Sequence, residues 1–194
     1  MALLTEQQLR TIGFKAVGQN VRISDKASIY NAANISIGDN VRIDDFVVLS
    51  AGAGGISLGN HIHIAVYTSL IGAGAITIGD FANLSSRVSV YSSSDDYSGE
   101  TMTNPCVPDE YKNVLHAAVT FEKHVIVGCG SVVLPGVTLH EGVAVGALSL
   151  VTKTCQPFGI YAGTPARFVK ARSRDLLNLE QDYLVSAISA NKGK

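Results

Sequence analysis

The stretch Ile35-Ser-Ile-Gly-Asp-Asn-Val41-Arg-Ile43-Asp-Asp-Phe-Val47-Val-Leu49 holds three successive six-residue units, each with small aliphatic residues at its first and third positions. The same rule runs from about residue 21 to residue 151, and Gly, Asp or Asn usually fills the corner that follows. A period of six matches neither an α-helix at 3.6 nor a long strand at 2.0. It is typical of very short strands joined by turns, and it predicts a β-helical solenoid.

Composition and charge limit the class of protein. The chain has 194 residues, which is enough for one sizeable core and too few to require two domains. A formal net charge of −1 leaves no strongly basic surface, so we expect neither a nucleic-acid partner nor membrane insertion. Trp is absent and aromatic residues make up only 7%, which suits a narrow interior of small aliphatic side chains.

The cysteines and the N-terminus indicate a compartment. Cys106, Cys129 and Cys155 are odd in number and form no CxxC spacing. They favour reduced thiols in a cytoplasmic protein over a disulfide framework or a zinc site, so no metal is expected. The first residues, Met-Ala-Leu-Leu-Thr-Glu-Gln-Gln, contain neither a basic region nor a long apolar run, and we expect no signal peptide.

The repeat divides the chain into three segments. Residues 1–20 are expected to form an N-terminal helix and cap, residues 21–155 the β-helix, and residues 156–194 a C-terminal segment with a helix. The repeat stops between Val90 and Val119, where Tyr91-Ser-Ser-Ser-Asp-Asp-Tyr-Ser-Gly-Glu is followed by Asn104-Pro-Cys-Val-Pro108. We interpret residues 91–118 as an excursion loop, and long loops that leave a regular scaffold are usually functional or disordered.

Two helices are expected outside the repeat. Thr5 and Gln8 have the spacing of a capping box and Gly13 suits a left-handed end, so the first helix should run from Thr5 to Ile12. The second should run from Arg174 to about residue 188. It is expected to lie against the solenoid end or a neighbouring chain and to cover an open β edge.

The repeat also orders side chains on the outer surface. Each unit buries its first and third residues and exposes the second. Counting three units per coil places His63, Asn83 and Ile126 in one outward-facing column, provided that the loop skips no corner.

The end of the repeat carries the most specific sequence. It reads Val125-Ile-Val-Gly-Cys-Gly-Ser-Val-Val-Leu-Pro-Gly-Val-Thr-Leu139, then Val145-Gly-Ala-Leu-Ser-Leu-Val-Thr-Lys153 and Tyr161-Ala-Gly-Thr-Pro-Ala-Arg-Phe-Val-Lys170. With the repeat and the loop, these stretches resemble the hexapeptide-repeat acyltransferases, especially the galactoside and maltose acetyltransferases and the polysaccharide-cluster sugar O-acetyltransferases. The resemblance implies an all-β solenoid, a left-handed parallel β-helix with an excursion loop and a C-terminal α-helix.

The resemblance also implies acetyl-CoA as the acyl donor. Its pantetheine arm is thin and carries amides, so it can lie along a stack of short strands and bond exposed backbone groups. Gly163 and Pro165 would shape a turn at the mouth, and Arg167 and Lys170 would meet the nucleotide phosphates. The residues expected to bind the cofactor are Cys129, Ala147, Thr152, Lys153, Gly163, Pro165, Arg167 and Lys170.

The catalytic base departs from the family pattern. Galactoside-type enzymes carry a histidine in the excursion loop, and the resemblance places Asp95 at that position. A carboxylate is a weaker base than histidine toward a sugar hydroxyl at neutral pH. We therefore expect His63 to be the base, oriented by Asp95 or Asp96 as in a catalytic triad, with His116 as the second candidate.

Polar residues near these positions are expected to bind the acceptor. They are His61, Asn83, Ser93, Asp96 and Tyr97. Two further histidines, His124 and His140, fall at corners of the repeat and are expected to be exposed without a catalytic role.

These expectations describe direct acetyl transfer to a sugar hydroxyl in O-antigen, capsule or exopolysaccharide synthesis, by a cytoplasmic homotrimer with active sites between subunits. N-acetylation of a nucleotide-linked amino sugar is the close alternative, because an amine depends less on a strong base. A zinc carbonic anhydrase needs three convergent histidines, whereas His61 and His63 alternate in direction along a strand. A non-catalytic scaffold is the last alternative, and the CoA-like C-terminal stretch argues against both.

Overall fold

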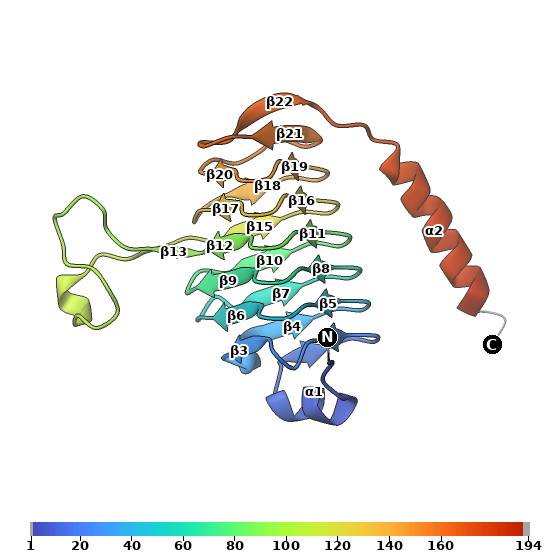
Figure 1. Ribbon diagram of the computed structural model, residues 1–194, viewed down its shortest axis with the longest axis horizontal. Coiled ribbons are helices and arrows are strands. Elements are labelled where there is room, and N and C mark those ends of the chain that lie inside the picture. Colours follow the sequence, from blue (N-terminus) through green and yellow to red (C-terminus); the bar gives the residue numbers. More distant parts are fainter. Residues whose placement is uncertain (1, 192–194) are drawn as a thin grey trace.

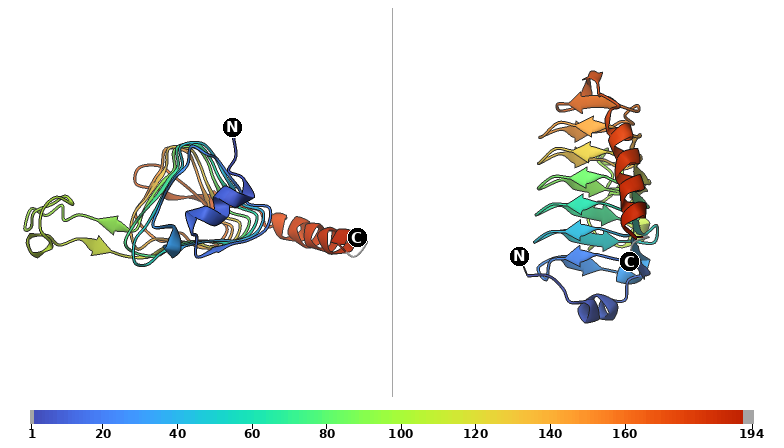
Figure 2. Two further views of the ribbon diagram at one scale, coloured as in Figure 1. Left: turned by 90° about the horizontal axis from the view of Figure 1, so that it is seen from below. Right: turned by 90° about the vertical axis from the view of Figure 1, so that its right-hand side faces the viewer.

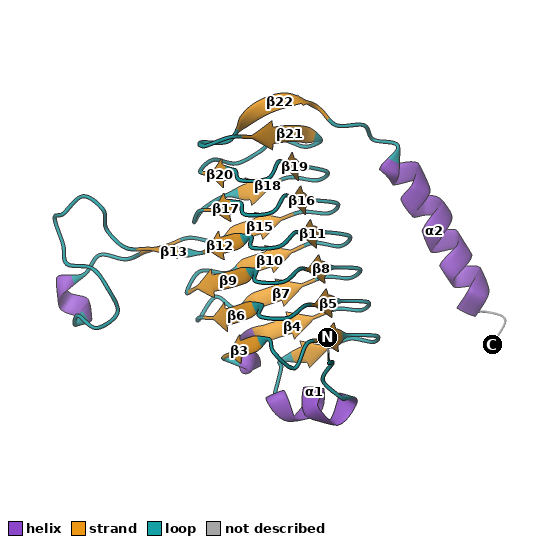
Figure 3. Cartoon of the chain, in the orientation of Figure 1, coloured by secondary structure: helices purple, strands orange, loops and turns teal. Residues whose placement is uncertain are grey.

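The computed structural model of the protein describes residues 2–191. The chain forms a left-handed parallel β-helix of about seven turns with an excursion loop and a C-terminal helix, which confirms the expected fold (Figures 1 and 3). Three sheets form the sides of a prism, which is seen along its axis in Figure 2. Residue 1 of the expected N-terminal segment and residues 192–194 of the expected C-terminal segment lie outside the described residues.

Each full turn contributes one short strand to each sheet. The first sheet contains β1 (Ala16–Val17), β4 (Ile35–Ile37), β7 (Ile56–Leu58), β10 (Ile76–Ile78), β15 (Val119–Phe121) and β18 (Thr138–Leu139). The second contains β2 (Arg22–Ile23), β5 (Arg42–Ile43), β8 (His63–Ile64), β11 (Asn83–Leu84), β16 (Ile126–Val127), β19 (Ala144–Val145), β21 (Gly159–Ala162) and β22 (Arg167–Ala171). The third contains β3 (Ser28–Tyr30), β6 (Val48–Ala51), β9 (Ser69–Gly72), β12 (Ser89–Tyr91), β17 (Val132–Val133) and β20 (Leu150–Val151).

The first and third residues of the repeat fill the interior. Ile43, Ile64 and Leu84 stand above one another on the second sheet and are fully buried. Phe121 is also fully buried and is in register with Ile78 of the preceding turn. Each such side chain adds about 1.5–3 kcal/mol of hydrophobic stabilisation, so the stacked turns hold the outer faces in fixed register.

The corners repeat as regularly as the strands. At the corner between the first and second sheets, most turns have a residue in the left-handed region, with φ between 52° and 61°. These residues lie one above another along the prism. We call them the first corner ladder: Asn20, Asn40, His61, Phe81, His124 and Phe158. Between the second and third sheets, Phe46, Tyr67 and Arg87 have φ between 60° and 63°, and with Lys26 they form the second corner ladder. This backbone region is uncommon for residues with a side chain, and stacking along the ladders offsets its cost.

Helix α1 (Glu6–Ile12) covers the N-terminal end of the β-helix. The expected capping box is present: the backbone N–H of Gln8 donates to Oγ1 of Thr5 at 3.2 Å, and the backbone N–H of Thr5 donates to Oε1 of Gln8 at 2.8 Å. Gly13 ends the helix with φ 81°. The β-helix begins at Ala16 rather than residue 21, because β1 already pairs with β4.

The C-terminal end differs from the sequence expectation. Strand β22 pairs antiparallel with β21 and is the last strand of the second sheet, so β22, not the helix, covers the edge of that sheet. Helix α2 (Leu176–Asn191) instead descends along the flank of the prism (Figures 1 and 2). Nη1 of Arg172 donates to the backbone carbonyls of His124 and Gly142, both at 2.9 Å, and this holds the approach to α2 against the first corner ladder.

The excursion loop leaves the prism between β12 and β15, away from α2 (Figure 2). Its base is an antiparallel pair, β13 (Ser93–Ser94) and β14 (Leu115–His116), and it contains the 3-10 turn η2 (Asp109–Tyr111). A further 3-10 turn, η1 (Ala32–Asn34), widens an earlier corner. In residues 2–191 no helix has both the length and the apolarity needed to cross a membrane.

Candidate active site

The expected outward column forms on the second sheet. His63 is in register with Asn83, and Asn83 is in register with Ile126. Arg42 occupies the same column one turn before His63. The column therefore changes from charged and polar side chains on the earlier turns to apolar ones on the later turns.

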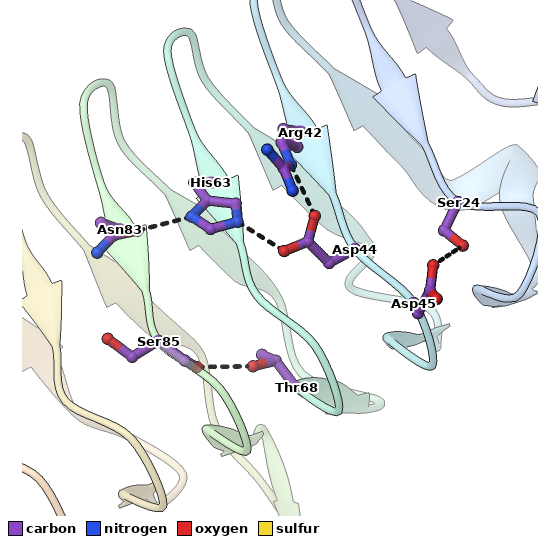
Figure 4. Close-up of polar contacts among 8 residues, drawn as sticks. All are labelled: Ser24, Arg42, Asp44, Asp45, His63, Thr68, Asn83 and Ser85. Atoms are coloured by element: carbon purple, nitrogen blue, oxygen red, sulfur yellow. Dashed lines mark hydrogen bonds and ion pairs between the residues drawn. The ribbon is translucent and has the colours of Figure 1, made fainter. Parts of the chain in front are cut away.

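His63 is held on both sides by polar side chains (Figure 4). Its Nε2 lies 2.8 Å from Oδ2 of Asp44 and its Nδ1 lies 3.2 Å from Oδ1 of Asn83. Because a carboxylate can only accept, a proton belongs on Nε2. Nδ1 faces the amide oxygen of Asn83, which also accepts, so Nδ1 can act as a base only after the Asn83 amide turns or moves aside. The side chain of His63 is 41% exposed, so its ring is open to an acceptor at the surface of the sheet.

Asp44 was not anticipated from the sequence. It also accepts a hydrogen bond from Nε of Arg42 at 2.7 Å, and its side chain is 14% exposed. Burial alone would raise its pKa, but the hydrogen bonds from His63 and Arg42 outweigh burial and lower the pKa below the ordinary value. Asp44 is therefore a carboxylate at neutral pH and can stabilise a protonated His63.

Within one chain, Asp44 is the carboxylate that holds His63. The expected role of Asp95 or Asp96 in orienting His63 stays a prediction. Asp96 accepts hydrogen bonds from Ser98 and Thr101 within the excursion loop, and these bonds, led by the one from Ser98, lower its pKa to about 2. Asp95 lies on the same loop, which leaves a different corner from the face that carries His63.

His116 and Ser93 form a separate pair at the base of the loop. Nδ1 of His116 lies 2.8 Å from Oγ of Ser93, and the backbone N–H of Ala73 donates to that Oγ at 2.7 Å. The pair joins β13 to β14 and to the neighbouring turn, while Tyr97 further along the loop is 93% exposed. The structure thus separates the two candidate bases, His63 and His116, on different elements of one chain.

The remaining histidines have packing roles that the sequence did not suggest. His61 stacks on Phe81 at 4.8 Å between ring centroids, and Tyr183 of α2 meets it edge-on at 5.4 Å. His124 was expected to be exposed, but its side chain is only 10% exposed because Glu180 of α2 binds its Nε2 at 2.8 Å. The predicted contact between His61 and an acceptor stays a prediction.

His140 also has a carboxylate partner. Its Nδ1 lies 3.0 Å from Oε1 of Glu122, and its side chain is 33% exposed. Within residues 2–191, no cluster of three or more His, Cys, Asp and Glu side chains could hold a metal ion.

The residues expected to bind the cofactor lie on the last turns. Cys129 and Ala147 are exposed at the corner between the second and third sheets, where the backbone N–H of Leu148 donates to the carbonyl of Cys129 at 2.8 Å. The turns meet closely here, because a Cβ on Gly128 would lie 2.4 Å from the backbone nitrogen of Ala147. The other expected residues are also on the surface of this end: Thr152, Lys153, Gly163, Pro165, Arg167 and Lys170.

Comparison with known proteins adds three relatives; no family model matches the chain. A dTDP-4-amino-4,6-dideoxy-D-glucose acyltransferase from Escherichia coli is 58% identical over 98% of this chain and 100% of its own length. A single-residue mutant of AntD, an N-acyltransferase from Bacillus cereus, is 47% identical with a TM-score of 0.92 over 95% of this chain and 98% of its own, in a complex with dTDP-4-amino-4,6-dideoxyglucose and coenzyme A. Another AntD structure holds dTDP and 3-hydroxybutyryl-CoA.

A more distant match comes from Escherichia coli strain K12. It is named as the lipopolysaccharide biosynthesis O-acetyl transferase WbbJ, and it is 27% identical over 76% of this chain and 74% of its own length.

Proposed function

Because the chain belongs to the hexapeptide-repeat acyltransferases that modify sugars, we propose that it N-acylates a dTDP-linked 4-amino-4,6-dideoxyglucose with a coenzyme A thioester as donor. The main support for this proposal is the 58% identity, over 98% of this chain and 100% of the relative, to an enzyme named for that acceptor. The sequence put O-acetylation first and N-acylation second. The comparisons favour the second, since the O-acetyl transferase is matched at 27% identity.

The later turns would hold the donor. Cys129 and Ala147 expose backbone groups along one corner, and Gly128 keeps that corner thin enough for a pantetheine arm to lie close to it. Arg167 and Lys170 lie on the exposed strand β22, where cationic side chains suit the phosphates of coenzyme A. AntD binds both coenzyme A and a 3-hydroxybutyryl thioester, so the acyl group transferred here includes acetyl and larger groups as candidates.

His63 is the proposed general base. The neutral amine attacks the thioester carbonyl carbon, and Nδ1 of His63 takes the proton that the nitrogen loses as the C–N bond forms. Asp44, on Nε2, stabilises the imidazolium. A backbone N–H holds the oxyanion until the C–S bond breaks, and the departing thiolate then receives a proton.

We further infer a homotrimer in the cytoplasm, with sites between subunits. Support comes from the excursion loop, where Tyr97, Met102, Tyr111 and Leu115 are between 55% and 93% exposed. Such a patch suits a neighbouring copy. The cytoplasm is where coenzyme A thioesters and nucleotide sugars meet.

The test compares an amine with a hydroxyl at the same sugar position. The purified protein is given acetyl-CoA or 3-hydroxybutyryl-CoA with dTDP-4-amino-4,6-dideoxyglucose, or with the analogue that carries a hydroxyl at C4, and thiol release and product mass are recorded. We expect an acyl-amine product that resists mild alkali. An alkali-labile ester formed on the hydroxyl analogue, with no product from the amine, would reverse the order of the two functions.

A further inference from the structure

Two corners of the prism carry stacked aromatic ladders, and only one of these ladders is covered. In the first corner ladder, Phe81 stacks between His61 and His124 at centroid distances of 4.8 and 5.1 Å. Tyr183 of α2 packs edge-on against His61 and Phe81, at 5.4 and 6.3 Å. A stack of this kind therefore also packs against a further aromatic ring that is perpendicular to it.

The second corner ladder is built in the same way but faces solvent. Phe46 and Tyr67 stack at 5.0 Å with 11° between their planes, and they are 45% and 50% exposed. Nζ of Lys26 lies 5.6 Å from the ring centroid of Phe46, and Cζ of Arg87 lies 5.4 Å from that of Tyr67. The result is an open stack of two rings with a cation at each end.

Arg87 is unusual among the cations of the middle turns. Between positions 27 and 152 the Lys and Arg residues are Arg42, Arg87, Lys112 and Lys123. Three of them pair with Asp44, Asp109 and Glu180, whereas Arg87 has no carboxylate partner among residues 2–191. Cζ of Arg87 lies over the Tyr67 ring, and a guanidinium carries its N–H donors in a planar fork that suits pairs of phosphate oxygens.

The ladder lies beside the column that carries His63. Tyr67 follows His63 on the same turn, and Arg87 follows Asn83 on the next one. Lys26 and Phe46 belong to the two preceding turns. A ligand along the ladder would therefore place one end next to the amide of Asn83 and the imidazole of His63.

We propose that the second corner ladder binds the nucleoside diphosphate half of the acceptor, with the diphosphate on Arg87 and the pyrimidine against the ring edges of Tyr67 and Phe46. This inference rests on the proposed function, because it names where the carrier of the amino sugar lies. Lys26, which is 3.6 Å from Asp45, closes the far end of the stack. The edge contacts repeat those that Tyr183 makes at the other corner.

Coenzyme A also carries a diphosphate, but the place of the ladder along the corner distinguishes the diphosphate of the acceptor from that of coenzyme A. Beyond Arg87 the same corner continues through Gly130 and Leu148, beside Cys129 and Ala147. Gly130 has no side chain, and the side chain of Leu148 occupies the space beside it, so the stack of planar groups ends at Arg87. The ladder and the expected cofactor residues therefore occupy opposite stretches of one corner, which assigns the ladder to the nucleotide of the acceptor.

The test is calorimetric titration of the intact protein with dTDP and, separately, with coenzyme A. Arg87→Lys keeps the charge but loses the planar fork, and Tyr67→Asn keeps the left-handed corner, as Asn20 and Asn40 do in this chain. Each should weaken dTDP binding by about 10- to 100-fold, the range for loss of one charge-assisted or stacking contact, with coenzyme A affinity unchanged. Leu148→Asn, also at a left-handed corner, is the control and should leave dTDP affinity unchanged.

The outcomes separate this inference from the proposed function. A wild-type protein that neither binds dTDP nor acylates the amine overturns the proposed function. A wild-type protein that binds dTDP, with unchanged affinity in both variants, overturns the ladder site alone. If the variants lose coenzyme A affinity instead of dTDP affinity, Arg87 belongs to the donor site. If they change the sedimentation coefficient but keep dTDP affinity, the ladder is a subunit contact. Either result also overturns the inference.

Discussion

Oδ2 of Asp44 lies 2.8 Å from Nε2 of His63, although the two residues belong to successive turns of the β-helix. The buried rows of aliphatic side chains fix the register between turns, and that register brings the pair together. The hydrogen bond from Arg42 to the other carboxylate oxygen holds Asp44 in place. The proposed base is therefore positioned by the solenoid rather than by the excursion loop.

Replacing His63 with Ala should lower kcat by about 10²- to 10⁴-fold, because the proton acceptor is lost. The fold should stay intact, since His63 is a partly exposed residue on the outer face. Steady-state kinetics with dTDP-4-amino-4,6-dideoxyglucose would measure the loss, and His140→Ala on another face is the control. Near-normal turnover by the His63→Ala protein would move His116 to first place.

Asp44→Asn should lower kcat by roughly 10- to 100-fold, less than loss of the base itself, because the imidazolium loses its carboxylate partner. Asp45→Asn alters the next residue, which bonds Ser24 and Lys26 instead, and should leave kcat near the wild-type value. A pre-steady-state measurement of the acyl-transfer step would compare the variants. Equal rates for wild type and Asp44→Asn would remove Asp44 from the mechanism.

Helix α2 should undock in acid because its anchor is a carboxylate. Burial would raise the pKa of Glu180, but hydrogen bonds from Lys123 and His124 outweigh burial and lower it below the ordinary 4.5. A lowered pKa means that the stabilisation is present above 4.5 and is lost as the pH falls through the folded-state value. Hydrogen exchange should show α2 protected at pH 7 and unprotected near pH 3.

The Glu180→Gln protein provides the matched comparison for that helix. It should show weak protection of α2 already at pH 7, with little change between pH 7 and pH 5. If α2 exchanges at the same rate in both proteins, the contacts of Tyr183 and the strap of Arg172 hold the helix without the ion pair.

Gly128→Ala should destabilise the last turns. The added Cβ would lie 2.4 Å from the backbone nitrogen of Ala147, which cannot move without breaking the strand register. Overpacking of this kind costs about 1–3 kcal/mol, and coenzyme A binding should weaken as well. Gly146→Ala is the milder control because its nearest neighbour would be the Cβ of Ala162 at 3.1 Å, with the carbonyl oxygen of Tyr161 at 3.6 Å. Denaturant unfolding of both variants checks the order, and equal free energies of unfolding would contradict it.

The six-residue pattern predicts the strands, the core and the column of His63 and Asn83, because each depends only on counting within a turn. The contact between His63 and Asp44 depends instead on how the Asp44 side chain lies at the corner that follows β5, one turn earlier. Asp44 stands at the first corner position, outside the alternation of buried and exposed residues, so the pattern alone did not single it out. The presence of Arg42 in the same column was the signal that could have directed attention to it.

The C-terminal segment shows a second limit of sequence reasoning. The sequence predicts helix α2, but its docking site depends on contacts of Tyr183 and Glu180 with the first corner ladder, more than 50 residues earlier in the chain. The sequence predicts that Arg167 and Lys170 meet phosphates, but no local pattern shows that they lie on an antiparallel strand. The burial of His124 follows from that docking and could not be read from its corner position.

The reversal of the chain at β22 also affects whether another molecule can add a strand to this end of the β-helix. A stack of parallel strands resembles the growing tip of a fibre, since each open edge can template another molecule. In the second sheet the last strand runs against the direction of all the turns below it, so an incoming parallel strand finds the wrong spacing of donors and acceptors. At the opposite tip, α1 places Leu9 over the core. The second sheet is thus closed to a further parallel strand at its β22 end, although nearly all of the chain is built like a filament.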